Sequence, residues 1–246
     1  MPIVLFEHII NQQLKRIVPA KALRDYIDCF YVLDWRQPCL AFSDGIPTMA
    51  ILADGEASVR MNGELLKGAW LSTEVLEQVQ IEPVSHRGEI LVVRFNPVTF
   101  HQLNNIDAIA AAAWAADTIA GKIKAIEALV YEKPNLNYLF EQALRLLDEE
   151  KGAMAIQSIL AQLKVNYKWL ERSFSAHMGL SPKAYARLQR FIHAYAALVK
   201  EGGHDLSAVA IHNGYYDQNH FIKEFRKFTG MSPLKYVKGR AMMTLF

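Results

Sequence analysis

Apolar residues in the second half of the chain recur every three or four positions, which is the spacing of amphipathic helices. The apolar positions that would share inward helix faces are Leu206, Val209, Ala210, Phe221 and Phe225. Between these runs, Gly214 stands where a chain leaving a helix needs a positive φ, and Asp217 is placed to cap the next helix, which should end near Phe228. The pattern therefore predicts a helix-turn-helix unit over residues 205–236.

A second copy of this pattern lies 51 residues upstream, as the positions 181 and 232 show. The matched pairs are Phe174 with Phe225, Gly179 with Gly230, Ser181-Pro182 with Ser232-Pro233, and Tyr185 with Tyr236. One such pattern would be a weak signal, because any short helix pair can produce it. Two copies at a single displacement predict a duplicated structural unit.

The first copy should contain a helix over about 153–163 and a second helix over 166–177. A long helix, 182–200, follows, and Gly202-Gly203 ends it. At about 1.5 Å per residue, a helix of this length can hold the second helices of the two units roughly 34 Å apart, which is one turn of DNA.

The first half of the chain has a different pattern, with short apolar runs separated by Gly, Asp and Pro. The runs that predict strands are 29–35, 47–53, 56–61, 64–70, 75–81 and 89–95. Asn62-Gly63 lies between two of them and favours a type I′ hairpin. We expect a small antiparallel sheet or an incomplete barrel.

Helical spacing also occurs around and after this region. The predicted helices are 20–27, 106–119, 123–131 and 136–147. The charged segment 148–152 ends in glycine and is typical of a domain boundary. The predicted fold class is α+β, with a β-rich lobe and flanking helices over 1–150. An all-α domain of two helix-turn-helix units joined by a long helix should occupy 151–246.

Charge is distributed unevenly between the two parts. The whole chain has a net charge of only +2, but residues 1–151 contain 14 Lys/Arg against 20 Asp/Glu, and residues 152–246 contain 13 against 5. Basic charge is therefore concentrated on the part that carries the duplicated unit. A solvated basic surface would not explain that coincidence, whereas binding to the phosphates of DNA requires it.

On these residues, the segment from about Gly152 to the end resembles the DNA-binding domain of the AraC/XylS family of bacterial transcription regulators. The resemblance implies that each unit places a recognition helix in one of two successive major grooves of double-stranded DNA. The second unit fits better than the first. In the first, Lys164 stands in place of the usual turn glycine, and Asn166 replaces the usual serine cap. Since Asn caps as well as Ser, only the turn geometry departs from the pattern.

The residues expected to contact DNA project from the outer faces of the two predicted recognition helices. They are Tyr167, Lys168, Glu171, Arg172, Gln218, Asn219, His220, Lys223, Arg226 and Lys227. The fork of Arg172 can meet guanine O6 and N7 together, which makes it the foremost candidate for base recognition. Lys223, Arg226 and Lys227 are better suited to phosphates, which adds affinity without sequence discrimination.

Several of these residues have a second interpretation. Glu171 either accepts from cytosine N4 or only orients Arg172, and Gln218 and Asn219 either pair with adenine or serve as solvated residues near a helix start. Tyr167 suits a thymine methyl or a phosphate. His220 fits either the edge that faces DNA or a hydrogen-bonded structural role. The neighbouring Trp169 and Tyr215 are expected in the core, as aromatics at helical spacing usually are.

The sequence disfavours a disulfide-rich, membrane-spanning or secreted protein. Cys29 and Cys39 are too few for a disulfide framework and fit the reducing cytoplasm. The longest run of small apolar residues, 108–116, is too short to span a membrane, and no signal peptide opens the chain. We therefore expect a cytoplasmic protein with no membrane partner.

The role of the first lobe stays open between several alternatives. As a cupin-like metal enzyme or small-molecule-binding protein, it would rely on His86, Glu89 and His101, but two histidines close together on one strand are absent. We expect no catalytic residue, metal or cofactor. In the resembling family such lobes bind effectors, form homodimers, or both. The large residues that fit either a pocket lining or a core are Phe30, Tyr31, Trp35, Phe42 and Trp70.

Overall fold

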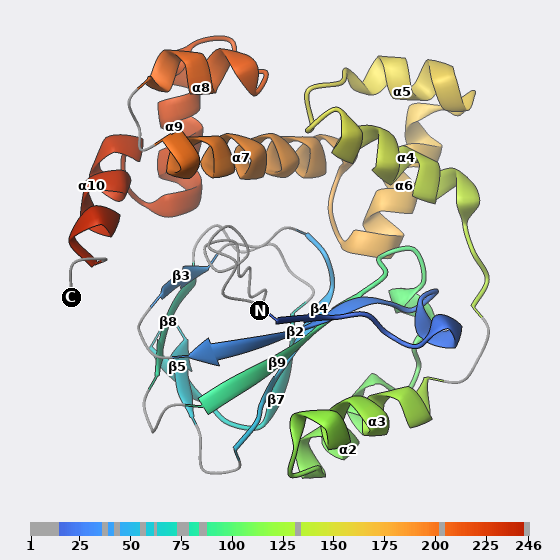
Figure 1. Cartoon of the computed structure of the whole chain (residues 1–246). Coiled ribbons are helices and arrows are strands. Elements are labelled where there is room, and N and C mark those ends of the chain that lie inside the picture. The colour runs from blue at the N-terminus through green and yellow to red at the C-terminus, as the bar shows by residue number, and fades with distance from the viewer. Residues whose placement is uncertain are drawn as a thin grey trace. The chain divides into compact units, whose positions relative to one another are not determined.

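The chain folds into two compact units. The computed structural model describes residues 15–35, 39–41, 45–54, 58–61, 63–72, 79–83, 88–130, 134–201 and 205–243. The first unit contains the chain up to Tyr138 together with Ser175–Gly179, and the second contains Leu139–Phe174 and Leu180–Phe246. Most elements of both units are labelled in Figure 1.

Two antiparallel sheets form the β-rich part of the first unit (Figure 1). The five-stranded sheet has the order β1 (Lys15–Ile17), β2 (Ile27–Trp35), β9 (Gly88–Phe95), β4 (Thr48–Leu52) and β7 (Ala69–Ser72). The four-stranded sheet has the order β3 (Cys39–Ala41), β8 (Val79–Pro83), β5 (Val59–Met61) and β6 (Glu64–Leu66). This confirms the predicted small antiparallel architecture and the α+β fold class.

The predicted hairpin joins β5 and β6. Met61 pairs with Glu64 across the ladder, so two residues make the turn. Gly63 has a φ of 89°, which a type I′ turn requires at its second central position. Asn62 lies outside the described residues.

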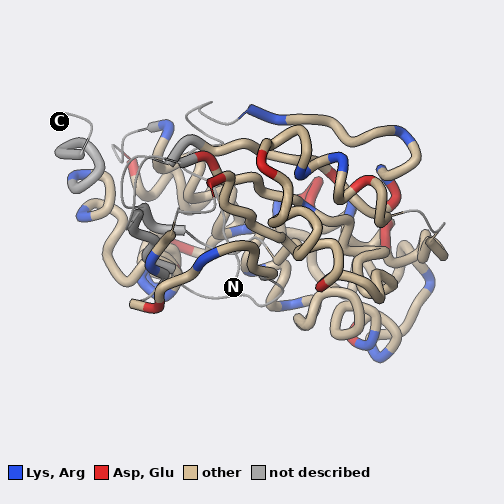
Figure 2. The backbone as a smooth tube through the Cα atoms, turned by 90° about the horizontal axis from the view of Figure 1, so that it is seen from below, with Lys and Arg blue, Asp and Glu red and all other residues tan. Residues whose placement is uncertain are grey.

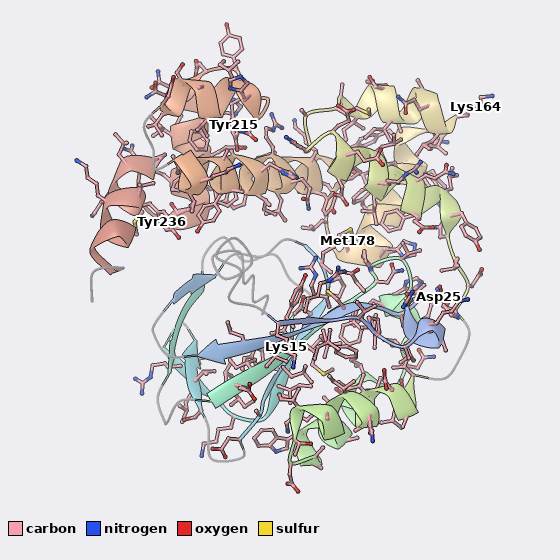
Figure 3. All side chains as sticks on the ribbon, viewed as in Figure 1. Lys15, Asp25, Lys164, Met178, Tyr215 and Tyr236 are labelled. Atoms are coloured by element: carbon pink, nitrogen blue, oxygen red, sulfur yellow. The ribbon has the colours of Figure 1, made fainter. Side chains whose placement is uncertain are left out.

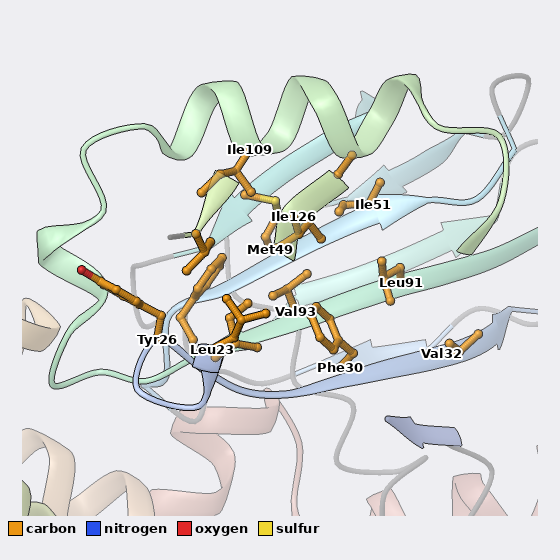
Figure 4. Packing of buried hydrophobic residues seen from close by; sticks show 14 residues of the cluster. Leu23, Tyr26, Phe30, Val32, Met49, Ile51, Leu91, Val93, Ile109 and Ile126 are labelled. Carbon is orange, nitrogen blue, oxygen red and sulfur yellow. The ribbon is translucent and has the colours of Figure 1, made fainter. Parts of the chain in front are cut away.

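A hydrophobic core lies between the five-stranded sheet and the helices α2 (Ile106–Ala115) and α3 (Ile119–Leu129), as Figure 4 shows. Alternate residues of the central strands point toward these helices, because side chains of a strand alternate between its two faces. The core residues contributed by strands include Phe30, Val32, Met49, Ile51, Leu91 and Val93. Phe30 is fully buried in this core, so of its two interpretations the structure supports the core.

The largest differences between predicted and observed helix boundaries lie in the first unit. The segment predicted as a helix over 20–27 is a single 3-10 turn, η1 (Lys21–Leu23), before β2 begins. The helix predicted over 106–119 ends at Ala115, because Ala116 is extended and Thr118 caps a new helix by accepting a hydrogen bond from the Gly121 amide. That cap moves the start of α3 four residues ahead of the predicted position.

A buried lysine joins α2 to α3. The side chain of Lys122, in α3, is 1% exposed. Its Nζ donates to the backbone oxygens of Ala113 at 3.2 Å, Trp114 at 3.3 Å and Ala116 at 2.6 Å. These carbonyls stand at the C-terminal end of α2, where four backbone oxygens have no partner within the helix. Lys122 therefore caps a helix that is not its own.

The second unit is helical throughout the part that the structure describes. Its helices are α4 (Tyr138–Glu149), α5 (Ile156–Leu163), α6 (Tyr167–Met178), α7 (Pro182–Glu201), α8 (Leu206–His212), α9 (Gln218–Thr229) and α10 (Pro233–Met243). Within the described residues, no helix is both long enough and apolar enough to cross a membrane.

Helix α4 packs with the helices that follow it. The rings of Phe140 and Phe174 meet edge to face at 5.1 Å, and the Tyr185 hydroxyl donates to Asp148 Oδ1 at 2.8 Å. The compact second unit accordingly includes α4 from Leu139 on. The apolar face of α4 has to be buried somewhere, and spacing alone could not show that α6 and α7 bury it.

Candidate nucleic-acid interface

The first helix-turn-helix consists of α5, a short turn and α6. Lys164 adopts the left-handed conformation in the turn, with φ 53° and ψ 41°. The usual turn geometry is therefore kept without glycine, at a cost of about 1–2 kcal/mol. Figure 3 shows the Lys164 side chain pointing away from the turn. Asn166 caps α6, as predicted, because its Oδ1 accepts a hydrogen bond from the Trp169 amide at 2.8 Å.

The two faces of α6 differ as the sequence predicts. Leu170 and Phe174 are fully buried on the inner face. The exposed residues on the outer side include Tyr167, Lys168, Glu171 and Arg172. Trp169 is half-buried, not fully within the core as expected, because it lies on the border between the two faces.

The second helix-turn-helix consists of α8, a turn and α9, and aspartates cap both helices. Asp205 accepts a hydrogen bond from the Ala208 amide at 2.9 Å, and Asp217 accepts one from the His220 amide at 2.7 Å. Gly214 has a φ of 76° in the turn between the helices. The Asp217 cap and the positive φ of Gly214 are as the sequence predicts, whereas the Asp205 cap is found only in the structure.

Helix α9 buries an aromatic face and exposes a polar one. Phe221, Phe225 and Phe228 are buried. The exposed residues are Gln218, Asn219, Lys223, Arg226 and Lys227. The outer face of α9 therefore combines amides, which can pair with base edges, and cations, which can bind phosphates.

His220 and Tyr215 lie at the edge of this face. The His220 ring meets the Tyr215 ring edge to face at 5.3 Å and is half-buried. The contact favours the structural interpretation of His220 over a direct DNA contact. Tyr215 is buried, as expected, and this burial raises the pKa of its phenol, with the neighbouring Glu224 carboxylate as a further cause.

The acidic residues of this region are largely engaged within the protein. Residues 152–246 contain five acidic residues, of which Asp205 and Asp217 cap helices and Glu224 is buried against Arg187. The exposed faces of α6 and α9 therefore carry mainly positive charge, and Figure 2 marks the Lys and Arg positions along the backbone. A surface of this kind attracts a polyanion over distances of about 10 Å at 0.1 M salt.

Two of the three metal-ligand candidates of the cupin-like interpretation lie in the part of the chain that the structure describes. Glu89 lies on β9, His101 lies in η2 (Phe100–Gln102), and His86 is outside the described residues. In the described part of the chain, no group of three or more His, Cys, Asp or Glu side chains could hold a metal ion. Cys29 is a buried free thiol.

Two structural repeats, each with a capped helix whose outer face is polar, define a tandem helix-turn-helix domain. Residues 159–239, from α5 into α10, match the family model described as a helix-turn-helix domain. The C-terminal part of the chain is similar to this family, which confirms its resemblance to the AraC/XylS type.

Relatives with known names match the same part. The HTH-type transcriptional activator RhaS of Salmonella arizonae is 30% identical over 84 residues, which are 34% of this chain and 30% of RhaS. RhaS of Salmonella newport gives the same values. The chain thus matches about 30% of the length of these curated relatives. Among solved structures, ToxT from Vibrio cholerae O395 is similar with a TM-score of 0.48 and 10% identity, over 87% of this chain and 98% of that one.

Proposed function

We propose that this protein is a sequence-specific DNA-binding transcription regulator. The observation that carries the proposal is the pair of recognition helices, α6 and α9, each capped at its start and each exposing a polar face. The helix between the two units, α7, has 20 residues and is therefore about 30 Å long, close to one turn of DNA. One copy of the chain can thus engage two successive major grooves.

Within this proposal the exposed residues divide into two groups. Arg172 reads a guanine, with Glu171, Gln218 and Asn219 as further base contacts. Lys168, Lys223, Arg226 and Lys227 bind phosphates, and Tyr167 contacts a thymine methyl or the backbone. His220 supports the start of α9 through Tyr215 and touches DNA only at the edge of the interface.

Selection of bound sites from a random oligonucleotide pool tests this function most directly. The expected result is enrichment of duplexes that carry two conserved segments about one helical turn, roughly 10 base pairs, apart. Affinity for these duplexes should fall steeply as salt rises, because bound phosphates release counterions. A pool that is not enriched, or an affinity that is insensitive to salt, would contradict the proposal.

Arg172→Ala is expected to weaken binding to the selected duplex by about 1–3 kcal/mol and to relax the preference at one base pair. The matched control is Lys223→Ala, which also removes one exposed cation from a recognition helix. It should weaken binding to selected and random duplexes alike and lower the salt slope by about 1. Titrations of both variants against both duplexes measure the difference. Equal losses on both DNAs for Arg172→Ala would contradict its role in base recognition.

In this proposal the first unit has a regulatory role. The protein as a whole is cytoplasmic and has no enzymatic activity. The five-stranded sheet of the first unit packs with α2 and α3 around a hydrophobic core of its own. Regulation through this unit operates by binding an effector, by forming a homodimer, or by both. Sedimentation of the full chain across a concentration series, alone and with DNA, tests the homodimer.

A further inference from the structure

A cluster of polar side chains joins the connecting helix to the second recognition helix. Arg187, in α7, donates from Nε to Oε1 of Glu224, in α9, at 2.6 Å. The arginine side chain is 35% exposed, and the glutamate side chain is 9% exposed. By contrast, the ion pair Arg145–Glu149 spans 3.8 Å and its side chains are 66% and 60% exposed. The Arg187–Glu224 pair is therefore much shorter and more shielded from solvent.

Three further polar atoms of this cluster are buried, and the Tyr215 hydroxyl is a neighbour of the Glu224 carboxylate. The three atoms are Glu224 Oε2, the Tyr215 hydroxyl and Arg190 Nε. Arg190 stands one turn after Arg187 on α7, donates from Nη1 to the Gly214 oxygen at 3.2 Å and lies 5.5 Å from the centre of the Tyr215 ring. Burial of a carboxylate and a guanidinium costs desolvation energy. An apolar residue in place of Glu224 would avoid that cost, so stability alone does not account for a carboxylate here.

Aromatic contacts also join α9 to α7. Phe228 stacks on Phe191 with ring centres 4.3 Å apart, Phe225 meets Phe191 at 5.8 Å, and Phe225 and Tyr195 lie 6.3 Å apart. Burial of apolar area holds the helices together but has no preferred direction. A short charged hydrogen bond does have a direction, and it constrains both the rotation and the axial position of α9.

The rotation of α9 determines where its outer side chains point. Glu224 and Lys223 are adjacent in α9, but Glu224 is buried and Lys223 is exposed. A helix turns by 360° in 3.6 residues, or about 100° per residue. Even a partial rotation about the aromatic contacts would therefore redirect Asn219 and Lys223 together.

We propose that Glu224 is a positioning residue that acts through Arg187, with the ion pair setting the orientation of α9 on α7. The pair thereby determines which spacing between half-sites the protein accepts. This inference rests on the proposed DNA-binding function and assigns a role to a residue that makes no contact with DNA itself.

The test compares Glu224→Gln, Arg187→Met and the double variant in the full chain. The probes are the duplex selected by the unaltered protein, two duplexes with the second half-site moved by one base pair in either direction, and a random-sequence duplex. Each single variant should lower the ratio of selected to random affinity roughly tenfold, equivalent to about 1.4 kcal/mol. The preference for the original spacing should shrink. The double variant should lose no more than either single one, because both changes break one interaction.

Glu149→Gln is the matched control, since it removes one negative charge from the exposed pair on α4. The affinity ratio and the spacing preference should remain as in the unaltered protein. A variant that merely unfolds loses binding-competent protein and weakens binding to all duplexes equally, so its ratio does not change. An unchanged ratio, an unchanged spacing preference, or losses that multiply in the double variant would overturn the inference. Failure of the unaltered protein to select any duplex would instead overturn the proposed function.

Discussion

Gly152→Ala is expected to destabilise the second unit by about 3 kcal/mol or more. Gly152 has a φ of 68°, and a Cβ placed on it would lie 2.0 Å from the Ala186 oxygen and 2.9 Å from the Arg190 nitrogen. Both atoms belong to the backbone of α7, which cannot move aside without breaking its own hydrogen bonds. Left-handed backbone strain and a steric clash therefore act together at this residue.

Urea unfolding of the full chain, followed by circular dichroism, measures this change in the free energy of unfolding. Gly179→Ala is the matched control, because Gly179 has a similar φ of 66° but nothing lies within 4 Å of an added Cβ. Its cost should be only the backbone strain, about 1–2 kcal/mol. If both variants lost the same stability, the close approach of Gly152 to α7 would have no energetic role.

Lys122→Met is expected to destabilise the first unit by about 3 kcal/mol. Methionine keeps most of the volume of the aliphatic stem, but it cannot donate to the oxygens of Ala113, Trp114 and Ala116. These carbonyls would lose their shared donor at the end of α2. Burial lowers the pKa of Lys122, while Asp117 opposes that change.

Lys124→Met serves as the comparison, since Lys124 is exposed on the same helix two residues later. It should change stability by no more than about 0.5 kcal/mol. Thermal and urea unfolding of both variants would measure the difference. A Lys122 variant as stable as the Lys124 variant would show that other groups satisfy the end of α2.

Local signals in the sequence were sufficient to predict the caps and the buried faces of the helices in the candidate interface. A cap bonds an amide only three residues away, so Asn166 and Asp217 could be identified without knowledge of the rest of the fold. Helical periodicity likewise separated buried Phe174 and Phe225 from the exposed residues of α6 and α9. The burial of residues at the border of a helix face, such as His220 and Trp169, was harder to predict, because it depends on a neighbouring segment.

The duplicated helix-turn-helix, its charge and its outward residues were thus determined by the sequence, since caps, turns and periodicity act over a few residues. The tertiary structure alone decided that α4 joins the second unit, that Lys122 caps another helix, and that Glu224 pairs with Arg187. Glu224 and Arg187 are 37 residues apart in the chain. No spacing pattern links such residues, because their contact exists only once separate helices have packed against each other.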